Sequence, residues 1–145
     1  MNASVSGETT SGGLQRLPRA LQLNQPAIVV LELGANDGLR GLPLNLASAN
    51  LSRMIDLARQ AGARVLLVGM RIPPNYGPRY TTDFASMYSD LAGRYHLPLV
   101  PFLLVSVALD PARMQEDRMH PNANGEPAVL ETLWPQLEPM LHKNR

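Results

Sequence analysis

Hydrophobic residues follow two patterns along the chain, short continuous runs and a helical repeat. Runs rich in Val, Ile and Leu are typical of buried strands in a parallel sheet, and they occupy residues 27–33, 64–70 and 97–103. Elsewhere apolar residues recur every three or four positions, which predicts helices. The helical stretches are residues 14–24, 45–61, 81–95 and 126–142, with a single turn at 110–114. Strands that alternate with helices predict a parallel sheet covered by helices on both faces.

The segments between these elements are polar and rich in turn-forming residues. The first thirteen residues are small and polar, which is typical of a loop or a tail. Residues 34–43 and 71–79 each follow a predicted strand, and 117–124 precede the last helix. In a parallel sheet the functional loops gather beyond the carboxyl ends of the strands. We therefore expect the site to be built from these three loops.

Composition limits the function more than it defines it. The chain has 145 residues, enough for one compact domain, with a net charge of +1 and scattered basic residues, which does not favour a nucleic-acid surface. It has no Cys, so a disulfide scaffold and a Cys-ligated metal are excluded. The longest apolar run, residues 97–109, is interrupted by Pro98 and Pro101 and is shorter than the roughly 20 residues that span a bilayer.

An aspartate and a histidine three residues apart are the first candidates for chemistry. Asp117 lies in the string DRMHP and is able to fold back onto His120, hold the imidazole in one tautomer and leave Nε2 free as a base. The simpler interpretation is that Asp117 caps a turn and His120 is merely exposed. Because D-x-x-H is a weak motif, the string alone favours the simpler interpretation.

Two further polar strings are compatible with an oxyanion hole. Asn36, in GANDG, directly follows a strand, so that its amide is able to point into a cleft, although Asn, Asp and Gly are also the commonest turn residues. Gly7 offers a backbone N–H, but chain ends are more often disordered tails. Tyr76 and Tyr80 are equally compatible with a substrate pocket and with loop packing. The sequence contains no G-x-S-x-G, P-loop, dinucleotide or H-E-x-x-H motif.

Taken together and in order, four segments closely resemble one family. NASVSGETTSGGLQRLP, VVLELGANDGLRGLP, RIPPNYGPRY and MQEDRMHPN are similar to the bacterial multifunctional thioesterase/arylesterase/lysophospholipase group of the SGNH hydrolase superfamily. The resemblance runs over nearly the whole chain. It implies an α/β fold, a flavodoxin-like three-layer α/β/α sandwich with a parallel sheet. It also implies hydrolysis of carboxylic esters and thioesters through a serine acyl-enzyme, without a cofactor or a metal.

The resemblance also assigns roles to individual residues. His120 would be the catalytic base and Asp117 its orienting carboxylate, while Gly7 and Asn36 would donate to the oxyanion. Other residues would bind the substrate, either in a mobile loop over the acyl groove or in the lining of that groove. They are Gly38, Leu39, Arg40, Arg71, Ile72, Pro73 and Tyr76.

The chain departs from the family pattern at the nucleophile. In the family a Gly-Asp-Ser-Leu block precedes the Gly block, and no G-D-S string occurs here. Ser4, Ser6 and Ser11 match positions within or after the Gly block and are not candidates. We therefore expect residues 1–145 to be a single domain that is incomplete at the N-terminus, lacks the first, central strand and helix, and has weak or no activity alone.

The expected departure has consequences for the sheet and for the function. Residues 1–6 would be the remnant of a second strand, and the bare edge of residues 27–33 would favour a strand-swapped homodimer.

The alternative function is a non-catalytic acyl-binding or interaction module, although the joint presence of all four site residues favours an ester hydrolase. The family also suggests that the parent enzyme is periplasmic or secreted. Neither nucleic-acid binding nor stable membrane insertion is expected.

Overall fold

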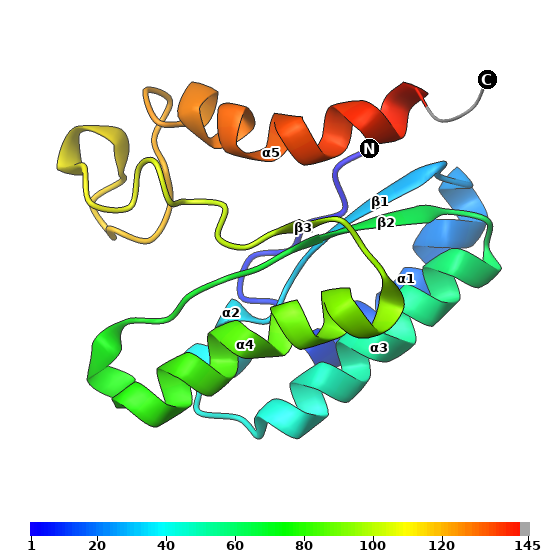
Figure 1. The fold of residues 1–145 in the computed structure, drawn as a ribbon, viewed down its shortest axis with the longest axis horizontal. Helices are drawn as coiled ribbons and strands as arrows, with labels where there is room; N and C mark the ends of the chain where they lie inside the picture. The colour runs from blue at the N-terminus through cyan, green and yellow to red at the C-terminus, as the bar shows by residue number, and fades with distance from the viewer. Residues whose placement is uncertain (143–145) are drawn as a thin grey trace.

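The computed structural model describes residues 1–142, and these contain a three-stranded parallel sheet (Figure 1). The strands are β1 (Ile28–Glu32), β2 (Arg64–Val68) and β3 (Leu99–Val100), in the order β1-β2-β3. All three lie where the hydrophobic runs predict them. The third is much shorter than its run, because Pro98 and Pro101 flank it and lack the N–H that a sheet ladder needs.

The helices also agree with the helical repeat in the sequence, and most begin slightly earlier than predicted. Those that match predicted segments are α1 (Thr10–Asn24), α3 (Leu44–Gln60), α4 (Pro78–Tyr95) and α5 (Glu126–His142). Three short elements complete the structure: α2 (Ala35–Leu39) and the 3₁₀ turns η1 (Pro74–Tyr76) and η2 (Pro111–Arg113). The turn predicted at residues 110–114 is confirmed by η2.

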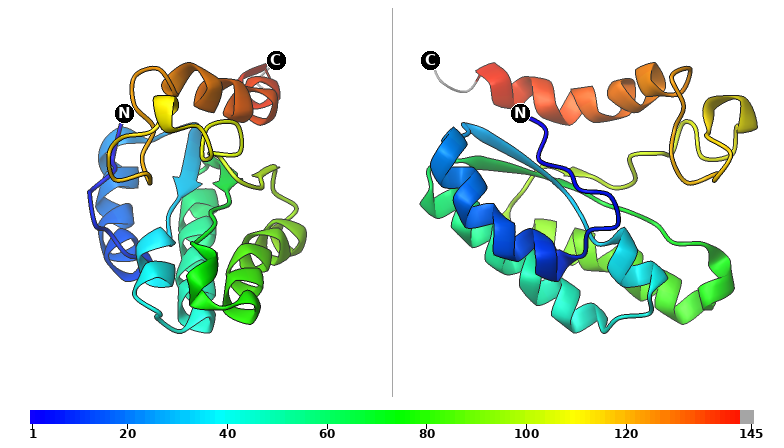
Figure 2. Two further views of the ribbon diagram at one scale, coloured as in Figure 1. Left: turned by 90° about the vertical axis from the view of Figure 1, so that its left-hand side faces the viewer. Right: turned by 180° about the vertical axis from the view of Figure 1, so that it is seen from behind.

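Helices cover both faces of the sheet (Figures 1 and 2). Because side chains alternate along β2, the sheet separates two hydrophobic cores. Val65 and Leu67 face the layer of α1, α3 and α4, where Leu51, Ile55 and Phe84 are fully buried. On the opposite face, α5 covers the sheet, and its side chains pack against Leu66, Val68 and Val100. The architecture is therefore the three-layer α/β/α arrangement that the sequence predicts.

Two expectations about local structure are wrong. Residues 10–13 belong to α1 and not to a tail, because the Thr9 side chain caps the helix by accepting a hydrogen bond from the Gly12 N–H. The predicted loop 34–43 contains the helical turn α2. Residues 1–6 form no strand, and their place as the remnant of a second strand stays a prediction.

The last helix continues through Pro135 and Pro139, although each proline removes a backbone donor. Packing of Leu133, Leu137 and Met140 against the sheet compensates for these losses. In the part of the chain that the structure describes, no helix is both long and apolar enough to cross a membrane.

Candidate active site

The loops that carry the candidate residues lie beyond the carboxyl ends of the strands (Figure 2, left). Charged groups in and after the loop of residues 117–124 affect the pKa of Glu32, the last residue of β1. Loss of solvation raises the pKa of Glu32, the charge of Glu126 raises it further, and the charge of His120 lowers it. His120 and the first turn of α5 are thus within electrostatic range of the last residue of β1.

Asp117 and His120 form the hydrogen-bonded pair that the sequence suggests. Asp117 Oδ2 lies 2.7 Å from His120 Nδ1. The second oxygen, Oδ1, accepts the backbone N–H groups of Met119 and His120 at 2.9 and 3.0 Å. The carboxylate therefore fixes both the ring and the loop. Nδ1 donates to Asp117 when the imidazole is neutral, which leaves Nε2 as a proton acceptor. The two side chains are 65% and 41% exposed, so Nε2 is open to a substrate.

The same hydrogen bonds predict an unusual titration for Asp117. The bond from His120, followed by those from the Met119 and His120 amides, lowers the pKa of Asp117 from its ordinary value to about 2. Carboxyl ¹³C NMR should find Asp117 ionised well below pH 3.8. Its contribution to folding stability is present above its unfolded pKa and is lost as pH falls toward 2. In His120→Ala the pKa should rise toward 3.8, and a midpoint that does not move would contradict the role of the ring.

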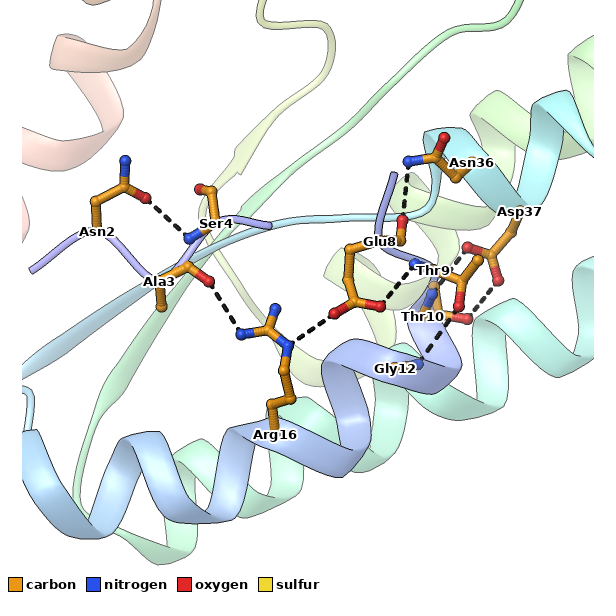
Figure 3. Close-up of polar contacts among 10 residues, drawn as sticks. All are labelled: Asn2, Ala3, Ser4, Glu8, Thr9, Thr10, Gly12, Arg16, Asn36 and Asp37. Atoms are coloured by element: carbon orange, nitrogen blue, oxygen red, sulfur yellow. Dashed lines mark hydrogen bonds and ion pairs between the residues drawn. The ribbon is translucent and has the colours of Figure 1, made fainter. Parts of the chain in front are cut away.

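Hydrogen bonds bring the Asn36 segment and the Gly7 segment together. The Asn36 side-chain amide donates to the Glu8 carbonyl at 2.9 Å (Figure 3). Arg40 donates to the Gly7 carbonyl at 3.1 Å. Gly7 has a φ of +74°, a conformation that favours glycine. Because an amide nitrogen carries two hydrogens, Asn36 keeps one N–H for a ligand next to Gly7.

A buried hydrogen-bond network, which the sequence does not reveal, holds the N-terminus of α1 against α2. Asp37 is 3% exposed and accepts hydrogen bonds from the Thr10 N–H at 2.8 Å and from the Thr10 hydroxyl at 2.6 Å (Figure 3). The Thr10 oxygen in turn accepts the Asn50 amide at 3.0 Å. The carboxylate thus stabilises the N-terminus of α1. It also fixes α2, which carries Asn36.

Gly34 explains how the chain turns from β1 into this network. Its φ is +122°, which side chains other than glycine rarely tolerate. A Cβ atom there would lie 2.5 Å from the Tyr88 hydroxyl, which donates to the Leu33 carbonyl at 3.0 Å. The close approach of Tyr88 therefore requires glycine directly before α2.

The predicted substrate-binding residues divide into two groups. Near α2, the Tyr76 hydroxyl donates to the Leu39 carbonyl at 2.8 Å, and Gly38 is buried so tightly that a Cβ would meet Phe84. Arg71 instead stacks over the Phe102 ring, with its guanidinium carbon 5.3 Å from the ring centre.

The remaining predicted substrate-binding residues, Ile72 and Pro73, differ in their exposure to solvent. Ile72 is 8% exposed and belongs to the core, while Pro73 is exposed. Arg71 and Ile72 also line an open cavity of about 490 Å³ beside α4. Their contact with a substrate stays a prediction.

The arrangement is suited to acid–base chemistry on an acyl group. A carboxylate-oriented imidazole provides a base, and a glycine N–H with a neighbouring Asn amide provides candidate oxyanion donors. Within residues 1–142, no group of three or more His, Asp or Glu side chains is placed to hold a metal ion. An α/β/α fold with these residues at the carboxyl ends of its strands is compatible with the acyl-hydrolase class.

Comparison with known proteins gives the family. Residues 1–127 match the model of the GDSL-like Lipase/Acylhydrolase family. The chain is 48% identical over 141 residues to Esterase TesA of Pseudomonas aeruginosa, covering 97% of this chain and 70% of that protein. It is 40% identical over 142 residues to Thioesterase 1/protease 1/lysophospholipase L1 of Escherichia coli K12, covering 98% and 68%. The chain therefore belongs to the GDSL-like lipase/acylhydrolase family.

A solved structure supports the same assignment. The crystal structure of TesA superposes with a TM-score of 0.92 at 47% identity and covers 97% of this chain and 78% of that one. The family resemblance and the α/β fold predicted from the sequence are confirmed. The chain spans about 70% of the length of these curated relatives.

Proposed function

We propose that these residues form the base and oxyanion half of a carboxylic ester and thioester hydrolase. The observation that carries the proposal is the 2.7 Å contact between Asp117 Oδ2 and His120 Nδ1, with Nε2 left accessible. The names of the relatives, an esterase and a thioesterase/lysophospholipase, support this substrate class. A periplasmic or secreted location for the parent enzyme stays a prediction.

In the proposed mechanism, His120 Nε2 accepts the proton of a serine hydroxyl as the serine oxygen attacks the acyl carbon. The N–H groups of Gly7 and Asn36 donate to the oxygen that becomes negative. The imidazolium, stabilised by Asp117, then protonates the leaving alcohol or thiol. A water molecule hydrolyses the acyl-enzyme in the same way, with His120 again as the base.

The serine would be supplied by a Gly-Asp-Ser-Leu segment, because none of the serines in these 145 residues lies in a G-D-S string. We expect the purified chain alone to hydrolyse a short-chain p-nitrophenyl ester weakly or not at all. Adding a synthetic peptide that carries the Gly-Asp-Ser-Leu strand should produce hydrolysis with a burst of product. Release of p-nitrophenol measures both.

The matched control is the same peptide with alanine in place of its serine, which should give no burst. Equal activity without any peptide would mean that a serine of this chain, or a water activated by His120, is the nucleophile. Binding of the peptide without hydrolysis would contradict the proposal and favour a non-catalytic acyl-binding or interaction module.

A further inference from the structure

His120 lies in one arm of a small hairpin formed by residues 112–122. The Gln115 N–H donates to the His120 carbonyl at 2.8 Å. Further from the tip, the Asn122 N–H donates to the Arg113 carbonyl at 2.9 Å. An isolated antiparallel bridge lies between these two hydrogen bonds. The position of the His120 backbone therefore depends on whether the hairpin stays closed.

The side chain of Asn122 makes four hydrogen bonds at the base of the hairpin. Its Nδ2 donates to the carbonyls of Ala112 and Met114, on the opposite arm, at 2.9 and 3.0 Å. Its Oδ1 accepts the N–H groups of Asn124 and Gly125, directly before α5, at 2.9 and 3.2 Å. Both amide hydrogens and the carbonyl oxygen of the side chain are thus used. Asn122 consequently joins the two arms to each other and to the start of α5.

The contact between the hairpin and α5 is also closely packed. A Cβ atom on Gly125 would lie 2.4 Å from the Arg113 carbonyl oxygen and 3.2 Å from the Pro121 Cβ. Both neighbours belong to the hairpin, and α5 in turn packs against the sheet. Figure 1 shows this segment, in yellow and orange, folding back toward the first turn of α5. The helix therefore offers a firm support, and Asn122 links the hairpin to it.

We propose that Asn122 is a positioning residue for His120, a role that rests on the proposed function of His120 as the base. Both amide hydrogens of Asn122 are donated to backbone carbonyls, so the side chain takes no part in proton transfer. With the hairpin open, Asp117 and His120 would stay bonded to each other but would shift as a pair. A displacement of about 1 Å is able to cost about 100-fold in rate. The competing explanation is that Asn122 only caps α5.

Asn122→Ser separates positioning from capping, because serine keeps an oxygen that caps a helix but is too short to reach the opposite arm. In the purified chain, the Gln115 N–H should exchange with solvent at least about tenfold faster than in the wild type. The Gly125 N–H should exchange within about threefold of the wild type, because the cap remains. NMR relaxation should also show a lower order parameter for the His120 ring.

A second variant and a control complete the set. Asn122→Asp keeps the cap and the length of the side chain but has no hydrogen to donate, so the same exchange pattern is expected if Asn122→Ser fails to fold. Asn124→Ala is the matched control, because it keeps the backbone N–H that Asn122 accepts and removes only an exposed side chain. Exchange and ring relaxation in Asn124→Ala should match the wild type.

Hydrolysis by the peptide-complemented chain gives the kinetic test. Asn122→Ser should lower kcat about thirty-fold and change KM by less than about twofold, because the base is displaced while the substrate contacts remain. Asn124→Ala should leave both constants unchanged. A variant that merely lost folded protein would instead show fewer active molecules in the burst and an unchanged rate per active molecule.

Three results would overturn the inference. Wild-type exchange at Gln115 in both folded Asn122 variants would show that the residue only caps α5. Faster exchange with an unchanged order parameter for the His120 ring would show that the hairpin does not position the imidazole. Faster exchange with an unchanged kcat would show the same by activity. If the wild-type complex itself is inactive, the proposed function fails, and exchange and relaxation still decide whether Asn122 positions His120.

Discussion

Alanine in place of His120 is expected to lower the turnover of the peptide-complemented chain by about 10⁴–10⁶-fold, as loss of the base does in serine hydrolases. Without the imidazole, no group accepts the serine proton or returns it to the leaving group. Substrate binding should change little, because the ring is 65% exposed. Release of p-nitrophenol at saturating peptide gives kcat and KM separately.

Two matched variants test whether the effect belongs to the pair. Asp117→Asn keeps the shape of the loop but no longer selects the tautomer with Nε2 free, so a loss of about 10⁴-fold is expected. His142→Gln removes an imidazole from the exposed end of α5 and should leave turnover unchanged. Retention of more than a tenth of the activity by His120→Ala would exclude His120 as the base.

Local patterns in the sequence predict most of the fold, because each element is stabilised by burial of its own apolar face. The repeat at residues 126–142 predicts α5 to the residue, although its two prolines argue against an unbroken helix. The run at 97–103 overstates β3, since hydrophobicity reports burial and not hydrogen bonding. Composition alone also conceals the start of α1, where Thr9 acts as a cap rather than as part of a tail.

The candidate site is predicted only where its partners are close in the sequence. Asp117 and His120 lie three residues apart, and the short string contains the whole interaction. Asp37 and Thr10 lie 27 residues apart, and both occur in segments that resemble ordinary turns and tails. Composition and spacing give no signal for this pair. The family resemblance identifies Asn36 but leaves its neighbour Asp37 unexplained.

Replacement of Asp37 by alanine is expected to lower the free energy of unfolding by about 3 kcal/mol. The change removes two hydrogen bonds to a carboxylate and leaves the N–H and hydroxyl of the fully buried Thr10 without that partner. It also removes a negative charge from the N-terminus of α1. Urea unfolding followed by far-UV circular dichroism measures the loss.

Asp83→Ala is the matched control for Asp37→Ala, because Asp83 pairs only weakly with Arg79 at 3.8 Å and both side chains are exposed. Its effect should stay within about 0.5 kcal/mol. Thr10→Val separates the hydroxyl from the N–H, and the double variant with Asp37→Ala should be less destabilised than the sum of the two. If Asp37→Ala unfolds like Asp83→Ala, the network does not hold α1 and α2 together. Asn36 would then need another support to serve as an oxyanion donor.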